Sequence, residues 1–244
     1  MGFELMPHSS GEAWGPLADE QLIERAARTG PVAMMWQSGQ GLVVPRTYRR
    51  YADFDAACER FGREGWPVSV RLSGGGIVPQ GPGILNLSLA WQAEGKPLDG
   101  SDEAYLLLCR ILADAIRPFG IDSHPAPVAG SFCDGRFNLA IGAADRVRKV
   151  AGTAQLWRRV PGATADGQTV QVVMAHALVL AQVDVAAVTA RANLFESLLG
   201  SGKQYLPERA ASLSDLCDPD AGDDFMSRLQ VSIAREIAQA SPAR

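Results

Sequence analysis

The longest apolar stretch of the chain, from Val170 to Val188, sets the first limit on the fold. A helix that crosses a membrane needs roughly 18 or more apolar residues in succession, but three polar side chains interrupt this stretch: His176, Gln182 and Asp184. We therefore expect no membrane span. The first part of the stretch, residues 170–181, instead predicts a β-strand within a soluble domain.

Length, charge and cysteine spacing limit the class of protein. The 244 residues, 47% of them apolar, can fill one sizeable domain. A net charge of -4 argues against a nucleic-acid partner, because phosphate contacts need a surplus of Lys and Arg. The start of the chain lacks the features of a secretory signal, so we expect a cytoplasmic protein. The four cysteines form no CxxC pair, which favours reduced thiols, and no residues show metal-ligand spacing.

Strand-like segments and amphipathic helices alternate along the chain. Helical spacing predicts helices over residues 17–28, 51–61, 102–117, 185–199 and 223–240. Apolar or alternating segments predict strands over residues 31–36, 41–45, 68–72, 84–91, 137–141, 150–157 and 170–181. This order predicts an α+β fold in which a largely antiparallel mixed β-sheet is flanked by helices. We expect a single domain over residues 1–244, with a core at about 17–217, a C-terminal helix at 223–240 and no accessory C-terminal domain.

A glycine-rich loop follows the predicted strand at 68–72. The three consecutive glycines at 74–76 allow a backbone to approach a ligand where a Cβ atom would collide, although a mobile turn is the alternative. A second turn, PQGPG, ends at Gly83. We expect a slender acyl chain to lie between these loops, with Arg71 at its polar end and three apolar neighbours: Ile77, Val78 and Ile84.

A second segment combines a cysteine with a basic pair. Cys133 lies in the loop sequence GSFCDGRFN, and Arg148 and Lys149 precede an apolar strand of small residues. The plain interpretation is an inert packing cysteine and an exposed lysine at a strand edge. The alternative is a thiolate stabilised by nearby cations and a sheltered ammonium that faces a developing negative charge.

Both segments resemble the paired motifs of the lipoate ligase family, which includes octanoyltransferases and amidotransferases and is distantly similar to biotin ligases. Residues 71–83 resemble its R-x-S-G-G-G-x-V motif, and RKVAGTAQ at 148–155 resembles its second motif, R/K-K-I/V-A/S-G-x-A-x. Residues 34–46 and 172–180 match more loosely, the latter with an H-G-x-L-L strand that contains His176. The resemblance implies the biotin/lipoate ligase catalytic-domain fold, which is class II synthetase-like.

The resemblance also implies the site residues. In the family, the lysine of the second motif contacts the acyl carbonyl or the activated phosphate, so we expect Lys149 to be catalytic. We expect His176 to support the site and not to act as a base. The expected substrate-binding set comes from the motifs and the neighbouring strand: Arg71, Ser73, Gly74, Gly75, Gly76, Gly83, Gly152, Thr153, Ala154 and His176.

Two mechanisms remain open on this scaffold. The SFCDGRFNL sequence resembles the cysteine-bearing stretch of the amidotransferase branch, which implies that Cys133 carries an octanoyl or lipoyl thioester without a cofactor. An ATP-dependent lipoate ligase would instead use ATP and Mg to form lipoyl-AMP, with no protein nucleophile. A third hypothesis is that the chain is a non-catalytic lipoyl-binding module. Two departures from the family pattern matter: Pro79 and Gln80 stand where a histidine is common, and Asp134 replaces a proline.

The resemblance to the family also implies the partners of the protein, and the remaining candidate residues have simpler explanations. The family implies a lipoyl carrier domain or the glycine-cleavage H protein as acceptor, and an acyl carrier protein or a lipoylated protein as donor. The basic group at 46–50 is either a solvated surface or a docking site for an acidic carrier. Two cysteines and two tryptophans are expected to be packing residues: Cys58, Cys109, Trp36 and Trp91.

Overall fold

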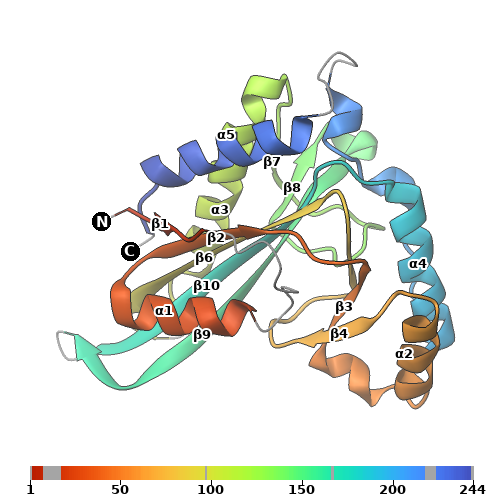
Figure 1. Ribbon diagram of the computed structural model, residues 1–244, viewed down its shortest axis with the longest axis horizontal. Helices are drawn as coiled ribbons and strands as arrows, with labels where there is room; N and C mark the ends of the chain where they lie inside the picture. Colours follow the sequence, from red (N-terminus) through yellow and green to blue (C-terminus); the bar gives the residue numbers. More distant parts are fainter. Residues whose placement is uncertain (1, 8–17, 97, 166–167, 218–223, 243–244) are drawn as a thin grey trace.

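The structure is a computed structural model that describes residues 2–7, 18–96, 98–165, 168–217 and 224–242. Within these residues, a large and a small β-sheet are covered by α-helices (Figure 1). This arrangement confirms the predicted α+β class and its largely antiparallel sheet. Among the described residues, no helix is long and apolar enough to cross a membrane.

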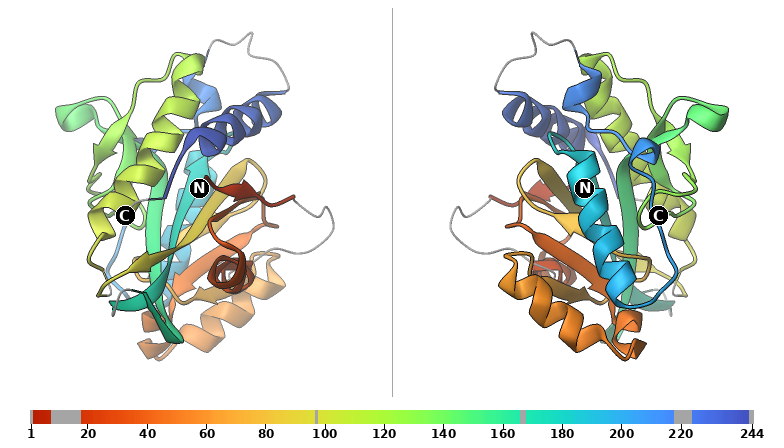
Figure 2. Two further views of the ribbon diagram at one scale, coloured as in Figure 1. Left: turned by 90° about the vertical axis from the view of Figure 1, so that its left-hand side faces the viewer. Right: turned by 90° about the vertical axis from the view of Figure 1, so that its right-hand side faces the viewer.

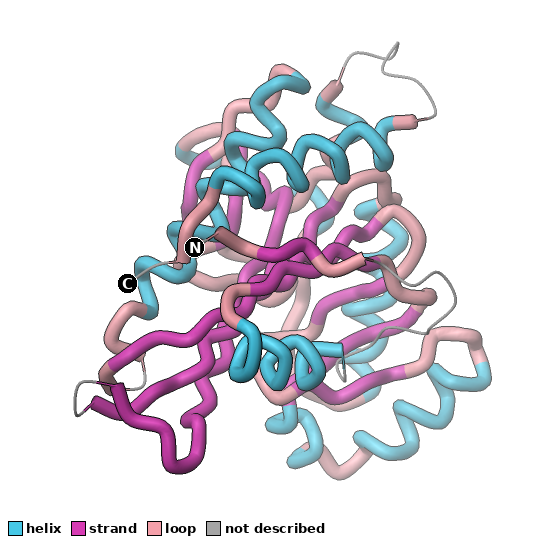
Figure 3. Tube along the Cα trace, turned by 60° about the vertical axis from the view of Figure 1, so that its left-hand side comes forward, coloured by secondary structure: helices cyan, strands magenta, loops and turns pink. Residues whose placement is uncertain are grey.

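The large sheet has seven strands in the order β1-β2-β6-β10-β9-β8-β7. Only β1 and β2 pair in parallel, and the other neighbours are antiparallel. Figure 3 shows β9 and β10 running side by side as the longest pair. The strands, in chain order, are β1 (Glu4–Leu5), β2 (Val32–Trp36), β6 (Ile84–Glu94), β7 (His124–Ala126), β8 (Asn138–Ile141), β9 (Arg148–Ala165) and β10 (Gln168–Leu180).

The small sheet has three strands in the order β4-β3-β5. The central strand, β3 (Gly41–Pro45), pairs in parallel with β4 (Val68–Arg71) and antiparallel with β5 (Val78–Gln80). The glycine loop connects β4 to β5, so its two ends are fixed by the same central strand. The loop meets Cys133, which lies shortly before β8 of the large sheet.

Helices cover both faces of the large sheet and the outside of the small one. α1 (Ala18–Thr29) packs on one face, and α3 (Ser101–Ile116) and α5 (Phe225–Gln239) pack on the other (Figure 2). α2 (Phe54–Arg63) and α4 (Val185–Leu198) share a core with the small sheet.

The alternation of side chains along β6 separates these two faces. Leu85, Leu87 and Leu89 are fully buried in the core beneath α3 and α5. The intervening residues Asn86 and Ser88 are equally buried but face the other way, because successive side chains of a strand point to opposite faces. The opposite face of the sheet, which carries the candidate site, therefore has buried polar side chains.

A register shift in β9 decides which way the basic pair points. Leu139 pairs with Ala151, but the next residue of β8, Ala140, pairs with Lys149, so Val150 is an extra residue. Such a bulge changes the alternation of the strand. Val150 and Ala151 therefore both enter the core beneath α3, and Lys149 is turned to the face that contains Gly152.

The predicted elements agree with the structure over most of their lengths. The segments at 31–36 and 41–45 are both strands, but they belong to different sheets. The strand predicted at 150–157 is longer than expected, and the short strands β1, β5 and β7 were not predicted. The predicted helix starts at 17 and 223 lie outside the described residues.

Candidate active site

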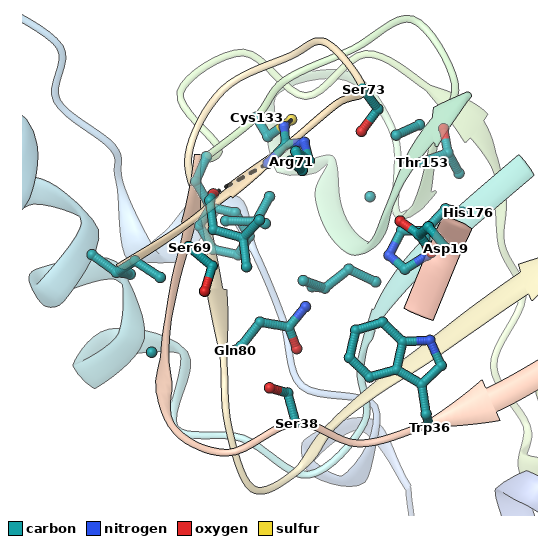
Figure 4. A pocket seen from close by; sticks show the side chains of 18 of the residues that line it. Asp19, Trp36, Ser38, Ser69, Arg71, Ser73, Gln80, Cys133, Thr153 and His176 are labelled. Atoms are coloured by element: carbon teal, nitrogen blue, oxygen red, sulfur yellow. Dashed lines mark hydrogen bonds between the residues drawn. The ribbon is translucent and has the colours of Figure 1, made fainter. Parts of the chain in front are cut away.

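A pocket of about 280 Å³ lies between the two sheets (Figure 4). Its residues come from α1, from the connection between β2 and β3, from the small sheet, and from β9, β10 and the loop before β8. They are Asp19, Trp36, Ser38, Gly39, Gln40, Gly41, Leu42, Val43, Pro67, Ser69, Arg71, Ser73, Val78, Gln80, Phe132, Cys133, Lys149, Gly152, Thr153, Ala154, His176 and Leu178.

A row of cross-strand neighbours forms the floor of the pocket; Gly152, Leu178 and Trp36 line it directly, and Asn86 is completely buried. Gly152 pairs with Leu178, Leu178 with Asn86, and Asn86 with Trp36. Adjacent strands lie about 4.8 Å apart, so the row spans roughly 14 Å from β9 to β2. Asn86 exchanges two 2.9 Å hydrogen bonds with Gln80, which closes the floor against the small sheet. The floor is long enough for an extended acyl chain.

Lys149 lies at the β9 end of this row and is completely buried. Its Nζ donates hydrogen bonds to the carbonyl oxygens of Phe132 at 2.8 Å and Cys133 at 3.0 Å. An ammonium has three donors, so one remains for a pocket ligand. Burial lowers the pKa of Lys149 to about 8, against the opposing effects of Cys133 and Asp134. A Cβ atom on Gly152 would lie 2.8 Å from Nζ, so this glycine leaves the space that the ammonium occupies.

Cys133 faces the glycine loop. The Gly76 N–H donates to its Sγ at 3.2 Å, and Nη2 of Arg71 lies 3.7 Å from the same sulfur. A Cβ atom on Gly75, where φ is +106°, would lie 2.8 Å from Sγ. Cys133 itself has a φ of 47°, an uncommon left-handed conformation for a non-glycine residue. The backbone is therefore held in a costly conformation that directs the thiol at a donor and a cation.

The loop that carries Cys133 is fixed from both sides. On one side, Lys149 donates hydrogen bonds to the carbonyl oxygens of Phe132 and Cys133. Asp134 accepts hydrogen bonds from the Val128 N–H at 2.8 Å and from Asn138 Nδ2 at 2.9 Å. Asp134 stands where the resemblance to the family implies a proline. Its carboxylate constrains the loop by hydrogen bonds, as the ring of a proline would do by its shape.

Arg71 organises the glycine loop from inside. Its Nη1 donates to the Val43 carbonyl at 3.1 Å, and its Nη2 donates to the carbonyl oxygens of Gly74 at 2.9 Å and Gly76 at 2.7 Å. Arg71 as a whole residue is 8% exposed, so it is a buried cation beside the Cys133 thiol. Its fixed fork geometry suits this multiple contact.

His176 belongs to a buried polar chain that starts in α1. Its Nδ1 lies 2.8 Å from Ser88 Oγ, which donates to Asp19 Oδ1 at 3.4 Å. Burial lowers the pKa of His176 to about 4, so its ring is neutral at pH 7. Burial raises the pKa of Asp19 to about 7, opposed by the Ser88 hydrogen bond and by Arg71.

The structure brings most of the predicted site residues together. Those that line the pocket are Arg71, Ser73, Cys133, Lys149, Gly152, Thr153, Ala154 and His176. The glycines at 74–76 contact Arg71 or Cys133 but are not among the residues that line the pocket. Gly83 lies apart, at a turn where an added Cβ would meet the Gln182 carbonyl oxygen.

Two expectations about apolar neighbours were wrong. Ile77 and Ile84 are completely buried in the core shared by the small sheet and α4, and only Val78 of the expected trio lines the pocket. Alternation accounts for Ile77, because Ile77 and Val78 point to opposite sides. Ile84 lies on the same face of β6 as Asn86, but it packs in the core shared with α4. Trp36, expected to be a plain core residue, is buried but lines the pocket.

The remaining candidates lie elsewhere. Burial raises the pKa of Cys58 to about 11 and of Cys109 to about 12, which fits the packing role expected for both. Asp19 was missed, since nothing near it in the sequence marks a site. Within the described residues, no group of three or more His, Cys, Asp or Glu side chains could hold a metal ion.

An α+β domain whose pocket brings together a completely buried lysine, a thiol and a buried arginine has the arrangement of a catalytic domain. A family model described as the lipoyl protein ligase A/B catalytic domain matches residues 17–234. The chain belongs to this family of enzymes.

Individual relatives agree with this assignment. An uncharacterized protein of Cupriavidus necator is 44% identical over 99% of this chain and 99% of its own length. The octanoyl-GcvH:protein N-octanoyltransferase of Kyrpidia tusciae is 34% identical over 68% of this chain and 56% of that protein, so the match spans little more than half of it. A crystal structure of lipoate-protein ligase A bound with ATP has the same fold, with a TM-score of 0.66, 15% identity, and coverage of 98% of this chain and 85% of that one.

Proposed function

We propose that this enzyme is a protein acyltransferase that carries an octanoyl or lipoyl group as a thioester on Cys133. It passes the group to a lysine of a lipoyl carrier domain such as the glycine-cleavage H protein, GcvH. The observation that carries the proposal is the placement of the Cys133 sulfur, with the Gly76 N–H at 3.2 Å and the Arg71 guanidinium at 3.7 Å. The similarity to an octanoyl-GcvH:protein N-octanoyltransferase supports it.

In the first step, the Cys133 thiolate attacks the carbonyl carbon of the acyl group on its donor. The C–S bond forms, the bond to the donor's amine or thiol breaks, and the departing group takes a proton from the Lys149 ammonium. The third N–H of Lys149 stabilises the negative charge on the carbonyl oxygen before the proton moves. An acylated GcvH lysine is the donor that best fits the similar transferase, and an acyl carrier protein is the alternative.

In the second step, the acceptor lysine, as a neutral amine, attacks the thioester carbonyl carbon. The C–N bond forms, the C–S bond breaks, and Cys133 leaves as a thiolate. The neutral Lys149 amine takes the proton that the attacking nitrogen loses, so both residues return to their starting states. A pKa of about 8 suits this exchange, because both forms of Lys149 are accessible near neutral pH.

An ATP-dependent lipoate ligase that works through lipoyl-AMP is the second candidate, and the likeness in fold to an ATP-bound ligase favours it. Such an enzyme would use Mg and would direct loop N–H groups at a phosphate. In this chain the glycine loop faces inward. The Gly76 N–H is bonded to Cys133, and the carbonyl oxygens of Gly74 and Gly76 accept from Arg71. This arrangement supports the transferase over the ligase.

A donor comparison tests the proposal. The purified chain is incubated with an unmodified lipoyl domain and either octanoyl-GcvH without ATP, or octanoate or lipoate with ATP and Mg. We expect acylation of the lipoyl domain from octanoyl-GcvH alone, followed by intact mass. Pyrophosphate release and acylation only with ATP would establish the ligase. Lipoate binding without transfer under either condition would indicate a binding module.

A further inference from the structure

A buried carboxylate lies outside the pocket, on α4 beside the small sheet (Figure 1). Glu196 is completely buried. The Tyr48 hydroxyl donates a hydrogen bond to its Oε1, and the Tyr205 hydroxyl donates to the same oxygen at 2.7 Å. Lys203 Nζ lies 4.0 Å from Oε1 and donates to the Tyr48 hydroxyl at 3.1 Å. We call these four residues the Glu196 cluster.

The Glu196 cluster is costly to bury, and its position in the core suggests what it does. A carboxylate loses its hydration in the interior, and apolar side chains of similar volume often replace such a group without loss of stability. The second oxygen of Glu196, Oε2, has no hydrogen-bond partner among the described residues. Tyr48 shares a core with Ile77 and Phe132, which are the neighbours in sequence of Gly76 and Cys133. The cluster therefore lies behind both loops that meet at the thiol.

Tyr48 connects the Glu196 cluster to the glycine loop. Burial and Glu196 raise the pKa of Tyr48, and the effects that oppose them include a hydrogen bond from the Ile77 backbone N–H. The Tyr48 hydroxyl thus accepts from the loop while it donates to Glu196. The preceding N–H of the loop, that of Gly76, donates to Cys133 Sγ at 3.2 Å. Two successive N–H groups of the loop therefore have separate partners, the thiol and Tyr48.

We propose that Tyr48 is a positioning residue: its hydroxyl, held by Glu196, fixes the Ile77 N–H and thereby keeps the Gly76 N–H on the Cys133 sulfur. The consequence for catalysis rests on the proposed function, because the Gly76 N–H stabilises the thiolate that accepts the acyl group. Tyr48 takes no part in bond making, and it is not among the residues that line the pocket. Loss of its hydroxyl should loosen the loop and weaken the support of the thiolate.

Two tyrosines of the Glu196 cluster form a matched pair for a test. Tyr48→Phe and Tyr205→Phe each remove one hydroxyl that donates to the same carboxylate oxygen. The main chain of Tyr205 is held independently of its ring, since its N–H donates to Asn193 Oδ1 at 2.7 Å and its carbonyl accepts from Asn193 Nδ2 at 2.8 Å. Both variants should therefore lose stability to a similar extent, and a difference in thiol reactivity between them isolates the contact with the glycine loop.

Alkylation of Cys133 by iodoacetamide, followed by peptide mass mapping from about pH 6 to about pH 10, measures the support of the thiolate. We expect Tyr48→Phe to lower the rate constant at pH 7 by about tenfold, the effect of one weakened hydrogen bond to a charged group. The rate should recover at high pH, where the thiol ionises without that support. Tyr205→Phe should keep the wild-type profile. An equal loss in the two variants, an equal loss at every pH, or no loss in a folded Tyr48→Phe variant would overturn the inference.

Two further measurements separate this inference from the folding of the variant and from the proposed function. In the wild-type protein, the Ile77 amide should exchange with deuterium as slowly as the amides of β3, and exchange at the rate of an exposed loop would overturn the inference. In a single turnover with octanoyl-GcvH, Tyr48→Phe should form the acyl-enzyme about tenfold more slowly than the wild type. Absence of any acyl-enzyme from the wild type would overturn the proposed function, whereas the alkylation profiles would still decide the role of Tyr48.

Discussion

Lys149 Nζ lies 3.0 Å from the carbonyl oxygen of Cys133, so the buried cation holds the backbone of the residue whose thiol faces the glycine loop. The two residues are far apart in the sequence, and the bulge at Val150 is what turns the lysine to this side of the sheet. A single ammonium thus fixes the loop that carries Cys133 and faces the pocket.

The pH dependence of transfer should report the ionisation of Lys149. Burial lowers its pKa to about 8, so the ammonium that we propose as the acid is lost as the pH rises through that value. We expect kcat/KM for octanoyl-GcvH to fall above about pH 8, and Lys149→Met to lower it by about 10³-fold at pH 7. A rate that keeps rising to pH 10 would argue against an acid role for Lys149.

Gly152→Ala should disable the site with little effect on the sheet. The new Cβ would lie 2.8 Å from Lys149 Nζ, and this ammonium is too confined by its two carbonyl partners to move without losing them. We expect activity to fall by about 10²-fold, as small misplacements of catalytic groups do. Gly135→Ala is the control, because a Cβ there meets nothing within 4 Å. Equal activity in both variants would mean that the position of the ammonium is unimportant.

Arg71→Lys should loosen the glycine loop although it keeps the charge. A lysine cannot reproduce the fork that reaches the carbonyl oxygens of Val43, Gly74 and Gly76. We expect a loss of about 1–3 kcal/mol in the free energy of unfolding and a tenfold or larger loss of kcat. Arg63→Lys on the exposed surface of α2 is the matched control. Denaturant titration and steady-state kinetics measure both effects.

Asp19 should make the free energy of unfolding decrease as the pH rises from about 4 to about 7. Its pKa is raised from 3.8 to about 7 by burial, with Ser88 and Arg71 opposing and the neutral His176 beside it. Between about pH 4 and pH 7 the unfolded chain ionises this carboxyl and the folded protein does not, so its contribution to stability is lost as the pH rises. Relative to Asp19→Asn, the free energy of unfolding should fall over this window by at most about 4 kcal/mol. A constant difference between the two proteins would contradict the raised pKa.

The fold was largely predictable because its strands and helices have clear periodicity. The helix at 102–117 and the strand at 170–181 agree with α3 and β10 to within about two residues. The three-strand sheet was not predictable as a separate unit, since its strands are short and their pairing joins residues distant in sequence. Local pattern carries no information about which sheet a strand enters.

The site was predictable only where motifs mark it. Lys149 and Cys133 lie together as the resemblance implied, but periodicity alone would have left the lysine at an exposed edge, because the bulge at Val150 has no sequence signal. Asp19 and Trp36 enter the pocket from α1 and β2 through tertiary packing, which no local pattern records. Ile77 and Ile84 were wrongly expected in the pocket, because neither the alternation at Ile77 nor the packing of Ile84 in the core shared with α4 can be foreseen from the loop sequence.

The covalent state of Cys133 during turnover shows whether the acyl group passes through a thioester on this residue. The enzyme is mixed with octanoyl-GcvH in the absence of an acceptor domain and of ATP, quenched in acid, and analysed by intact mass and peptide mapping. We expect one octanoyl adduct on Cys133, which hydroxylamine removes. The adduct should be absent from Cys133→Ala, which should be folded but inactive. Undiminished transfer by Cys133→Ala would contradict the thioester mechanism.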